Sequence, residues 1–448
     1  MKATHVMLLQ RRNAQRNQVV DNQEIYKSQM SPPIPPCPLS TQPICGQPLY
    51  TVLDDGAWAG QRCFLIGGGP SLIGFDFSRL DGELVIGINR AYEKIDPAII
   101  YTMDTRFIAW ASSGTISIEA RKKLYTSLAT RVFSRASTKN YPKGFYIIER
   151  SGSDLFQGSL RKGWCGHNNS GSGALSLAIA LGCSEIYLLG FDMHGDPVTD
   201  KQTWWHSGYP ADSIQKASVV YKAMRSAFGH HADAIKERAR VINCNPDSAL
   251  RCFEFGDLPE PCPPRPTVVG FYTAGTGYEA EAREMIASAH RMGLRTDVRA
   301  IENQGWQRNT SYKPRLLQEM VEKYWESAIV YTDADSRFMR YPALFNADGG
   351  LADFAYHRHK SKEVLSGTLF IRCNESTAAL MRLWAKTCEQ NPQTWDQRNL
   401  EIALGKWDGN CSILPAEYCC IFDYKPAPDK PVVIHYQASR RLKKEVGA

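Results

Sequence analysis

The chain has 448 residues, of which 43% are hydrophobic and 22% charged, and its formal net charge is +7. This composition indicates a globular protein and excludes a disordered or fibrous one. The length exceeds the size at which a single hydrophobic core stops growing, so two domains are expected. The modest positive charge allows anionic partners, such as nucleotides or nucleic acid, without requiring a nucleic-acid groove.

Neither a membrane span nor a disulfide framework is predicted. No apolar run approaches the roughly 18 residues that cross a bilayer, and the apolar stretch at the start is too short for a secretory signal. The 13 cysteines form no C-x-x-C pair, and their odd number favours reduced thiols over disulfides or a zinc site. These features together predict a cytoplasmic protein.

Two proline-rich stretches divide the chain. Residues 1–50 are polar and end in a dense proline run, which favours an extended N-terminal arm. A second proline cluster at 257–267 separates two stretches that each begin with a strand-like apolar run. We therefore expect one domain over residues 51–258 and a second over residues 259–448.

Both expected domains show an α/β pattern, with strands and helices following one another along the chain. The first has strand-like runs at 62–69, 83–89 and 98–104, an apolar helix at 172–182 and a further strand at 185–192. The second alternates strands with helices, at 267–273, 278–293, 295–301, 313–325 and 327–335. This order predicts parallel sheets with right-handed crossovers, and hence two tandem Rossmann-like domains. In such sheets, ligands bind at the carboxyl ends of the strands.

Two carboxylates stand at the end of the last of these strands. Asp333 and Asp335 follow the apolar run "SAIVYT", and residues two apart in a strand face the same side. Two nearby carboxylates both stay ionised at low cost only where a cation lies beside them. A hard divalent ion that bridges to a diphosphate would satisfy both. The alternative is a pair of solvated turn acids.

The stretches around this pair resemble the metal-dependent glycosyltransferases of the nucleotide-diphosphosugar (GT-A) fold. The resemblance covers most of 267–441 and rests on five stretches in the family's order: "GWQRNTSYKP", "VYTDADSRF", "LSGTLFI", "WDQRNL" and "PVVIHYQASRRLKK". It implies that Asp333 and Asp335 hold Mn2+ or Mg2+ on the donor diphosphate. His435 stands where the family often adds a metal ligand, and a structural histidine is the alternative.

The resemblance also implies residues that contact the nucleotide-sugar donor. Trp306, Asn309 and Lys313 lie at positions similar to donor contacts in related transferases, although a core tryptophan is the alternative for Trp306. The basic run near the C-terminus is expected to close over the donor phosphates, or else to be a solvated end of the chain. Its members are Arg440, Arg441, Lys443 and Lys444.

Two further pairs complete the expected site. Ser366 and Gly367 look like a tight turn beside the sugar, where a missing side chain admits a ligand. Asp396 opens a predicted helix, and as an N-cap it would contribute roughly 1 kcal/mol. The functional alternative, which we favour, places Asp396 and Gln397 beside the acceptor hydroxyl, where a carboxylate accepts its proton.

The first half carries a glycine turn, "IGGGPSL", which favours an anion or nucleotide close to the backbone. Over roughly 60–255, the first half distantly resembles the bacterial sialyltransferase-like fold and its phage and motility-associated relatives. The resemblance rests on this turn and on four stretches that follow it in order: "VIGINRAY", "NSGSGALSLAIALGCSEIYLLGFDMH", "WWHSGYPADSIQKA" and "VINCNPDSALRCF". That resemblance makes His206 the candidate general base, because an unperturbed imidazole titrates near neutrality; a surface histidine is the alternative. It also implies a nucleotide pocket lined by Gly68, Ser71, Asn89, Asn169, Ser170 and Gly171.

These features predict a cytoplasmic two-domain glycosyltransferase, and the resemblance of the first half suggests a phage or bacterial source. The second domain would use a nucleotide-sugar donor and Mn2+ or Mg2+, with a glycan, a small molecule or modified phage DNA as the acceptor. The first domain would be a second transferase or a nucleotide-binding partner. The alternatives are a nucleotidyltransferase that makes the activated sugar and a non-catalytic protein that binds nucleotides or glycans in vestigial pockets.

Overall fold

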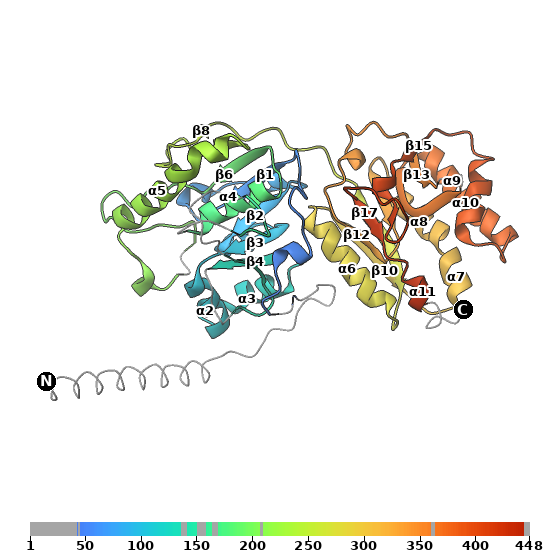
Figure 1. The fold of residues 1–448 in the computed structure, drawn as a ribbon, viewed down its shortest axis with the longest axis horizontal. Coiled ribbons are helices and arrows are strands. Elements are labelled where there is room, and N and C mark those ends of the chain that lie inside the picture. Colours follow the sequence, from blue (N-terminus) through green and yellow to red (C-terminus); the bar gives the residue numbers. More distant parts are fainter. Residues whose placement is uncertain are drawn as a thin grey trace, which may run out of the picture.

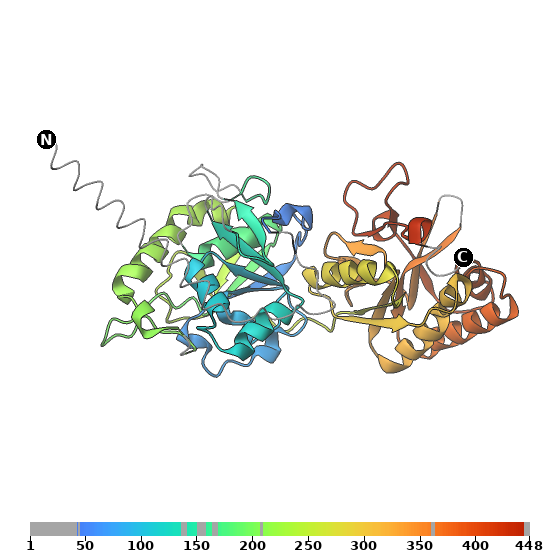
Figure 2. The same ribbon diagram turned by 90° about the horizontal axis from the view of Figure 1, so that it is seen from below.

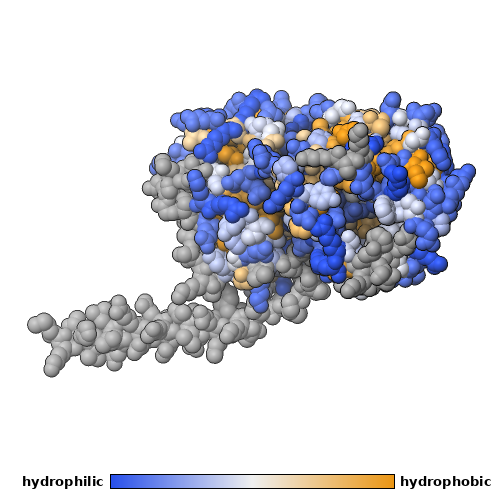
Figure 3. Space-filling view, turned by 45° about the vertical axis from the view of Figure 1, so that its right-hand side comes forward, coloured by the Kyte–Doolittle hydropathy of each residue, from blue (hydrophilic) through white to orange (hydrophobic). Residues whose placement is uncertain are grey.

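The chain forms two lobes that lie side by side, each built on its own sheet (Figures 1 and 2). We call residues 43–255 the first lobe and residues 267–442 the second lobe. On the face drawn in Figure 3, hydrophilic residues predominate, and none of the described helices is long and apolar enough to cross a membrane. The structure is a computed structural model that describes residues 43, 45–135, 141–149, 158–163, 169–206, 209–359 and 363–442.

Most of the predicted N-terminal arm lies outside the described residues. Its last residues pack onto the first lobe, where Pro48 pairs with Ile147 and Leu49 is fully buried.

Within the described residues, the first lobe holds an eight-stranded parallel sheet. Its strands are short and mostly apolar, which suits a sheet that is covered on both faces, and the sequence predicts four of them. The chain runs outward from β1 to β5 and then returns to the other side of β1, so the sheet switches direction between β1 and β6. In spatial order the strands are β5 (Tyr146–Glu149), β4 (Thr130–Arg135), β3 (Ile99–Thr102), β2 (Val85–Ile88), β1 (Arg62–Ile66), β6 (Glu185–Leu189), β7 (Arg240–Asn243) and β8 (Glu254–Phe255).

Helix α4 (Ser170–Ala180) lies against β1, β2 and β3. Its residues are small or apolar on every side, which is the pattern of a fully buried helix. It begins slightly before the predicted 172–182 because Asn169 caps it, with Asn169 Oδ1 accepting the Ser172 N–H at 2.9 Å. The other helices described in this lobe are α2 (Thr105–Ser113), α3 (Ile118–Thr126) and α5 (Ala217–Lys236).

The second lobe holds a mixed sheet, six-stranded in the part of the chain described. Strands β9, β10 and β11 run parallel, as the sequence predicts, but β14 is antiparallel to both β11 and β13. The connection from β13 to β14 is too short for the crossover that parallel strands need. In spatial order the strands are β10 (Thr296–Ile301), β9 (Thr267–Thr273), β11 (Ala328–Thr332), β14 (Val364–Arg372), β13 (Phe354–Arg358) and β15 (Cys411–Leu414).

A smaller sheet and the helices complete the second lobe. The small sheet consists of β12 (Ser336–Phe338), β17 (Val433–His435) and β16 (Cys420–Ile421). The predicted helices at 278–293 and 313–325 are present as α6 (Tyr278–Arg291) and α8 (Lys313–Lys323). The others described are α7 (Trp306–Ser311), α9 (Glu375–Gln390), α10 (Asp396–Leu404) and α11 (Ser439–Leu442). Both lobes are therefore α/β, as predicted.

A buried contact around Trp58 joins the lobes where α6 lies next to the first lobe (Figures 1 and 2). The Trp58 indole is fully buried, and its Nε1 donates to the Arg291 carbonyl at 2.9 Å. The Tyr341 N–H donates to the Ala57 carbonyl at 2.7 Å. The predicted domain boundary after residue 258 falls between β8 and β9 and stays a prediction.

Replacing Trp58 with Ala should destabilise the protein by about 3–5 kcal/mol, because it empties a buried volume and leaves the Arg291 carbonyl without its donor. The matched control is Trp325→Ala, which removes an indole that is 47% exposed and should change stability by no more than about 0.5 kcal/mol. Equilibrium unfolding in denaturant measures both variants. Equal unfolding midpoints for the two would show that the contact does not stabilise the fold.

Candidate functional site

Two carboxylates and an imidazole meet at the carboxyl end of β11. Asp333 and Asp335 follow this strand, and β17 brings His435 beside them. One ligand atom from each of the three side chains lies within 4.8 Å of the others. Carboxylate oxygens with an imidazole nitrogen are a suitable donor set for a divalent ion.

Hydrogen bonds from β11 itself and from the segment after β17 fix the two carboxylates. The Tyr331 hydroxyl donates to Asp333 Oδ1 at 2.8 Å, and the Ala438 N–H donates to Asp335 Oδ2 at 2.7 Å. The backbone N–H of Asp333 donates to the Gly367 carbonyl at 3.0 Å, which extends the pairing between β11 and β14. The acids are therefore held in place by the ends of strands.

Gly367 leaves the space that the cluster occupies. A Cβ at this position would stand 3.0 Å from His435 Cε1 and 3.2 Å from Asp333 Oδ2. Thr368 Oγ1 and His435 Nε2 share a hydrogen bond at 2.8 Å, which orients the imidazole. The predicted tight turn at Ser366 and Gly367 is wrong, because both residues lie within β14. The missing side chain makes room for the ligands Asp333 and His435.

A buried lysine connects this cluster to a third carboxylate. Lys313 Nζ lies 3.2 Å from Asp333 Oδ1 and 2.9 Å from Asp396 Oδ2, and it donates to Ser366 Oγ at 3.1 Å. Burial lowers the pKa of Lys313, but the two carboxylates outweigh burial and hold the pKa above its ordinary value. The ammonium group is therefore charged at neutral pH and balances both acids.

The charges in the cluster also shift the pKa values of its ligands. Burial raises the pKa of Asp333, Lys313 opposes the rise and Asp335 adds to it, so the net shift is upward. Burial also raises the pKa of Asp335, but its interaction with His435 outweighs burial and the net shift is downward. Burial lowers the pKa of His435, whereas Cys419 and Asp335 outweigh burial and raise it. A bound cation would therefore compete with protons for the same atoms.

Asp333 and Asp335 line a cavity of about 290 Å³ at the end of β11, whereas the predicted residues His435 and Gly367 are not among its lining residues. The structure thus brings together residues that the sequence predicts from four separate stretches, although their roles stay predictions. Besides Asp333 and Asp335, those that line the cavity are Asn309, Lys313, Ser366, Asp396 and Gln397.

Asp396 does not cap α10, because Trp395 holds the N-cap position and makes no side-chain capping bond. The Asp396 carboxylate instead binds Lys313 and accepts the Ser366 hydroxyl at 3.0 Å. Gln397 Nε2 donates to Glu363 Oε1 at 2.6 Å. The N-cap alternative for Asp396 is therefore wrong.

The arginines expected to close over the donor phosphates are engaged elsewhere. Arg440 binds Asp423, and Arg441 binds Glu281. Three other predicted positions cannot be placed, since Lys443, Lys444 and the side chain of Trp306 lie outside the described residues.

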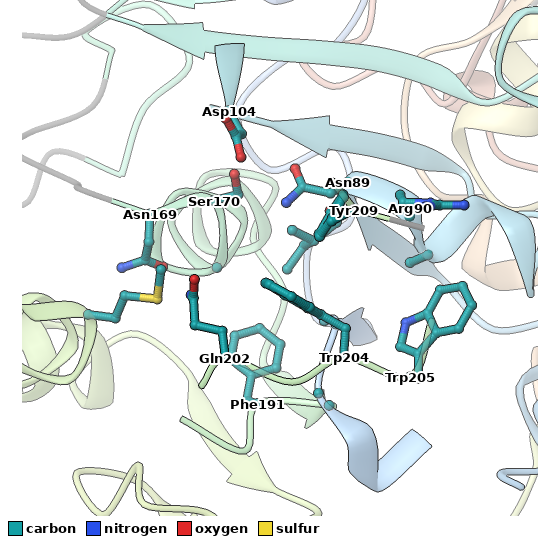
Figure 4. A pocket seen from close by; sticks show the side chains of 18 of the residues that line it. Asn89, Arg90, Asp104, Asn169, Ser170, Phe191, Gln202, Trp204, Trp205 and Tyr209 are labelled. Carbon is teal, nitrogen blue, oxygen red and sulfur yellow. The ribbon is translucent and has the colours of Figure 1, made fainter. Parts of the chain in front are cut away.

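A second cavity, of about 380 Å³, lies in the first lobe, where the sheet switches direction between β1 and β6 (Figure 4). Open α/β sheets bind ligands at this point. Ser71 is not among the lining residues; its N–H and hydroxyl donate to Asp192 at 2.8 and 2.5 Å. The predicted residues that line this cavity are Gly68, Asn89, Asn169, Ser170, Gly171 and His206.

Close packing against other parts of the chain explains why glycines stand in the turn after β1. A Cβ on Gly67 would stand 2.5 Å from the Gly190 carbonyl oxygen, and one on Gly69 would stand 2.4 Å from Asp192 Oδ1. At Gly68 a Cβ would meet Trp204 Cδ1 at 3.1 Å. The space beside Gly67 and Gly69, where an anion was expected to approach the backbone, is thus occupied by Gly190 and Asp192, which follow β6.

His206 lies among aromatic rings and does not titrate near neutrality. Trp204, Trp205 and Tyr209 surround its imidazole, with ring centroids 6.3, 4.7 and 4.5 Å away. Burial lowers the pKa of His206, and the charge of Arg90 lowers it further, to about 3. The expected titration near pH 7 is therefore wrong, and the role of His206 as a general base stays a prediction.

Sequence reasoning missed several residues that shape these sites. Tyr331 and Thr368 hold Asp333 and His435, but both stand within apolar strand runs that carry no functional pattern. Trp204 lines the first-lobe cavity. Its neighbours in "TWWHSGYP" gave a signal, since clustered aromatic residues in a loop often line a pocket.

Comparison with known proteins assigns the second lobe. Residues 286–445 match the family model described as nucleotide-diphospho-sugar transferase. This match agrees with the predicted GT-A-like fold. None of the curated proteins matches the chain. The chain is similar to a glycosyltransferase involved in the glycosylation of the major capsid of PBCV-1, with 12% identity and a TM-score of 0.32 over 40% of this chain and 97% of that chain. It is also similar to the apo-form glycosyltransferase GlyE of Streptococcus pneumoniae TIGR4, with 16% identity and a TM-score of 0.30 over 39% of this chain and 54% of that chain. The family match places a nucleotide-diphospho-sugar transferase domain at 286–445 and supports a glycosyltransferase activity for that part of the chain.

Gly367→Ala should weaken Mn2+ binding at least about tenfold, because the added methyl group displaces His435 or Asp333. Gly405→Ala is the matched control, since its Cβ would have no neighbour nearer than 3.6 Å. Calorimetric titration of the full chain with Mn2+ measures both affinities. Unchanged affinity in Gly367→Ala would rule out an ion between these two ligands.

Lys313→Met should destabilise the protein by about 3 kcal/mol, because it leaves Asp333 and Asp396 without their cation. Lys323→Met is the control on the same helix; it breaks an exposed pair with Asp297 and should cost no more than about 1 kcal/mol. Thermal unfolding compares the variants. Equal losses of stability in the two variants would show that the buried contacts of Lys313 stabilise the fold no more than the exposed Lys323–Asp297 ion pair does.

Proposed function

We propose that the transferase domain at 286–445 moves a sugar from a nucleotide-diphosphate donor to an acceptor hydroxyl, with a divalent ion held by Asp333, Asp335 and His435. The observation that carries this proposal is the approach of these three side chains to within 4.8 Å, beside a cavity at a strand end. The cluster falls inside the residues that match the family model.

The residues present fit a hard divalent ion such as Mn2+ or Mg2+. Two carboxylates and one imidazole supply the ligand atoms, and Gly367 keeps the space between them open. Once bound, such an ion neutralises negative charge on the departing diphosphate. Tyr331 and Thr368 keep the ligands in position before the donor arrives, which reduces the reorganisation that binding requires.

Two other polar groups of the cavity, Lys313 and Asp396, have separate roles in the proposed transfer. Lys313 is a fixed, buried cation that stabilises negative charge in the cavity. Asp396 lines the cavity beside Gln397, where its carboxylate would accept the proton of the acceptor hydroxyl.

The test is release of nucleotide from a panel of UDP-, GDP- and CMP-sugars by the full chain, with Mn2+, with Mg2+ and with a chelator. Activity should require a divalent ion and should fall at least about a hundredfold in Asp333→Asn or Asp335→Asn, which lose a metal ligand. The matched control is Asp408→Asn, which changes an exposed acid in the same lobe and should leave the rate unchanged. Full activity in excess chelator would refute the role of the ion.

The first-lobe cavity is a second candidate site. Its place at the switch point of a parallel sheet, and the six predicted residues that line it, favour a ligand site separate from the metal cluster. We infer that the first lobe is a binding domain, and a second transferase or nucleotide-binding role for it stays a proposal.

A further inference from the structure

Backbone strain gathers at the first-lobe cavity. Asn89 and Met193 both line it, and both hold left-handed backbone conformations, with φ of 52° and 56°. Residues other than glycine adopt such conformations at a cost that the surrounding structure must offset, and they occur preferentially at binding sites. Two such residues at one cavity indicate that the cavity is a binding site.

Two of the charged groups around this cavity, Asp192 and Arg90, have bonding partners within the protein. Asp192 accepts bonds from Ser71 and Asn245. Arg90 binds Glu93 through Nε and Nη2, at 2.5 and 2.9 Å. Its Nη1 is buried with no partner among the described residues, but Figure 4 shows the side chain pointing away from the polar wall described below.

Asp104, Arg106 and His206 also line the cavity. Asp104 faces Arg106, its nearest cation, at 3.4 Å, and His206 is neutral at pH 7. A phosphate group that approached Arg106 on this side would also meet the Asp104 carboxylate, which has the same charge as the phosphate.

Hydroxyl-binding groups form one wall of the cavity. Figure 4 shows Asp104, Asn89 and Ser170 gathered on one side, with the ring of Trp204 across the cavity from them. Asn89 Oδ1 accepts the Thr102 hydroxyl at 2.7 Å, which leaves its amide N–H groups to donate. Ser170 Oγ accepts the Met103 N–H at 2.9 Å, which leaves its own hydrogen to donate.

The Asp104 carboxylate completes the set as an acceptor. Its Oδ1 caps α2 by accepting the Arg106 N–H at 2.9 Å, and its Oδ2 has a partner only at 3.4 Å among the described residues. Donors and an acceptor side by side match a hydroxyl group, which donates one hydrogen bond and accepts others. An aromatic face opposite them matches the apolar C–H face of a sugar ring.

We propose that the first-lobe cavity binds a neutral saccharide, with one sugar ring on Trp204 and its hydroxyls on Asp104, Asn89 and Ser170. The cavity volume of about 380 Å³ lies in the range of small-molecule sites. The site lies outside the transferase domain at 286–445 and shares no residue with Asp333, Asp335 and His435. Saccharide binding here is therefore a function separate from the proposed sugar transfer.

The test is calorimetric titration of the full chain with the methyl glycosides of glucose, galactose, mannose and N-acetylglucosamine, and with CMP and UMP. At least one glycoside should bind saturably at millimolar concentration, with the same affinity with and without Mn2+ and in Asp333→Asn. Binding of the nucleotides at this site in place of the glycosides, or saturable binding of no glycoside, would overturn the proposal.

Asp104→Asn locates the bound sugar without disturbing the fold. Asparagine caps a helix as well as aspartate does, so the melting temperature should stay unchanged while glycoside affinity falls about tenfold with the loss of a charged acceptor. Trp204→Ala should lower the affinity at least as much. Glycoside binding that is unchanged in both variants would place the sugar elsewhere and refute the assignment.

Discussion

The pairing of one buried ammonium group with two carboxylates organises the second lobe. Lys313 contacts Asp333, which lies beside Asp335 and His435, and Asp396, which opens α10 on another side of the cavity. Removing these charges from water is costly unless each has a partner, so the lysine lets two acids face one cavity before any cation or donor is present. The neighbouring Ser366 hydroxyl donates to Asp396 and accepts from Lys313, which closes the network.

Sheet topology supplies the second constraint on this site. Because β14 runs antiparallel beside β11, Gly367 and Thr368 face the acids at the end of β11. β14 starts four residues before Thr368, the partner of the last β11 residue Thr332, so its interior lies beside the end of β11. The mixed sheet thus lets a strand interior supply both the empty space at Gly367 and the Thr368 hydroxyl that orients His435.

Local patterns in the sequence predicted strands β1, β2, β3, β6, β9, β10 and β11, the helices α6 and α8, and the meeting of Asp333 with Asp335. The place of His435 beside them came instead from the family resemblance. The locally predicted features follow from short apolar runs and from residues that end strands, which are visible within a few positions of the chain. The partner of Asp396 was not visible in this way, because Lys313 lies 83 positions before it and only the folded sheet brings the two together. Ser366 and Gly367 were assigned to a turn because the glycine signal is local, whereas the pairing that keeps them in β14 is not. The pKa of His206 likewise depends on rings and a charge that tertiary packing brings to it.

The Trp58 contact decides what kind of motion is available around the metal cluster. A fully buried, hydrogen-bonded indole between the lobes opposes hinge rotation, which usually requires a small and polar interface. The local arrangement around Asp333 and Asp335 is set instead by short segments of the second lobe. The segment after β17 is one such element: Gln437 lines the cavity in a left-handed conformation with φ of 52°, and the next residue, Ala438, donates to the ligand Asp335. Gln437 thus holds an uncommon backbone conformation directly beside Asp333 and Asp335.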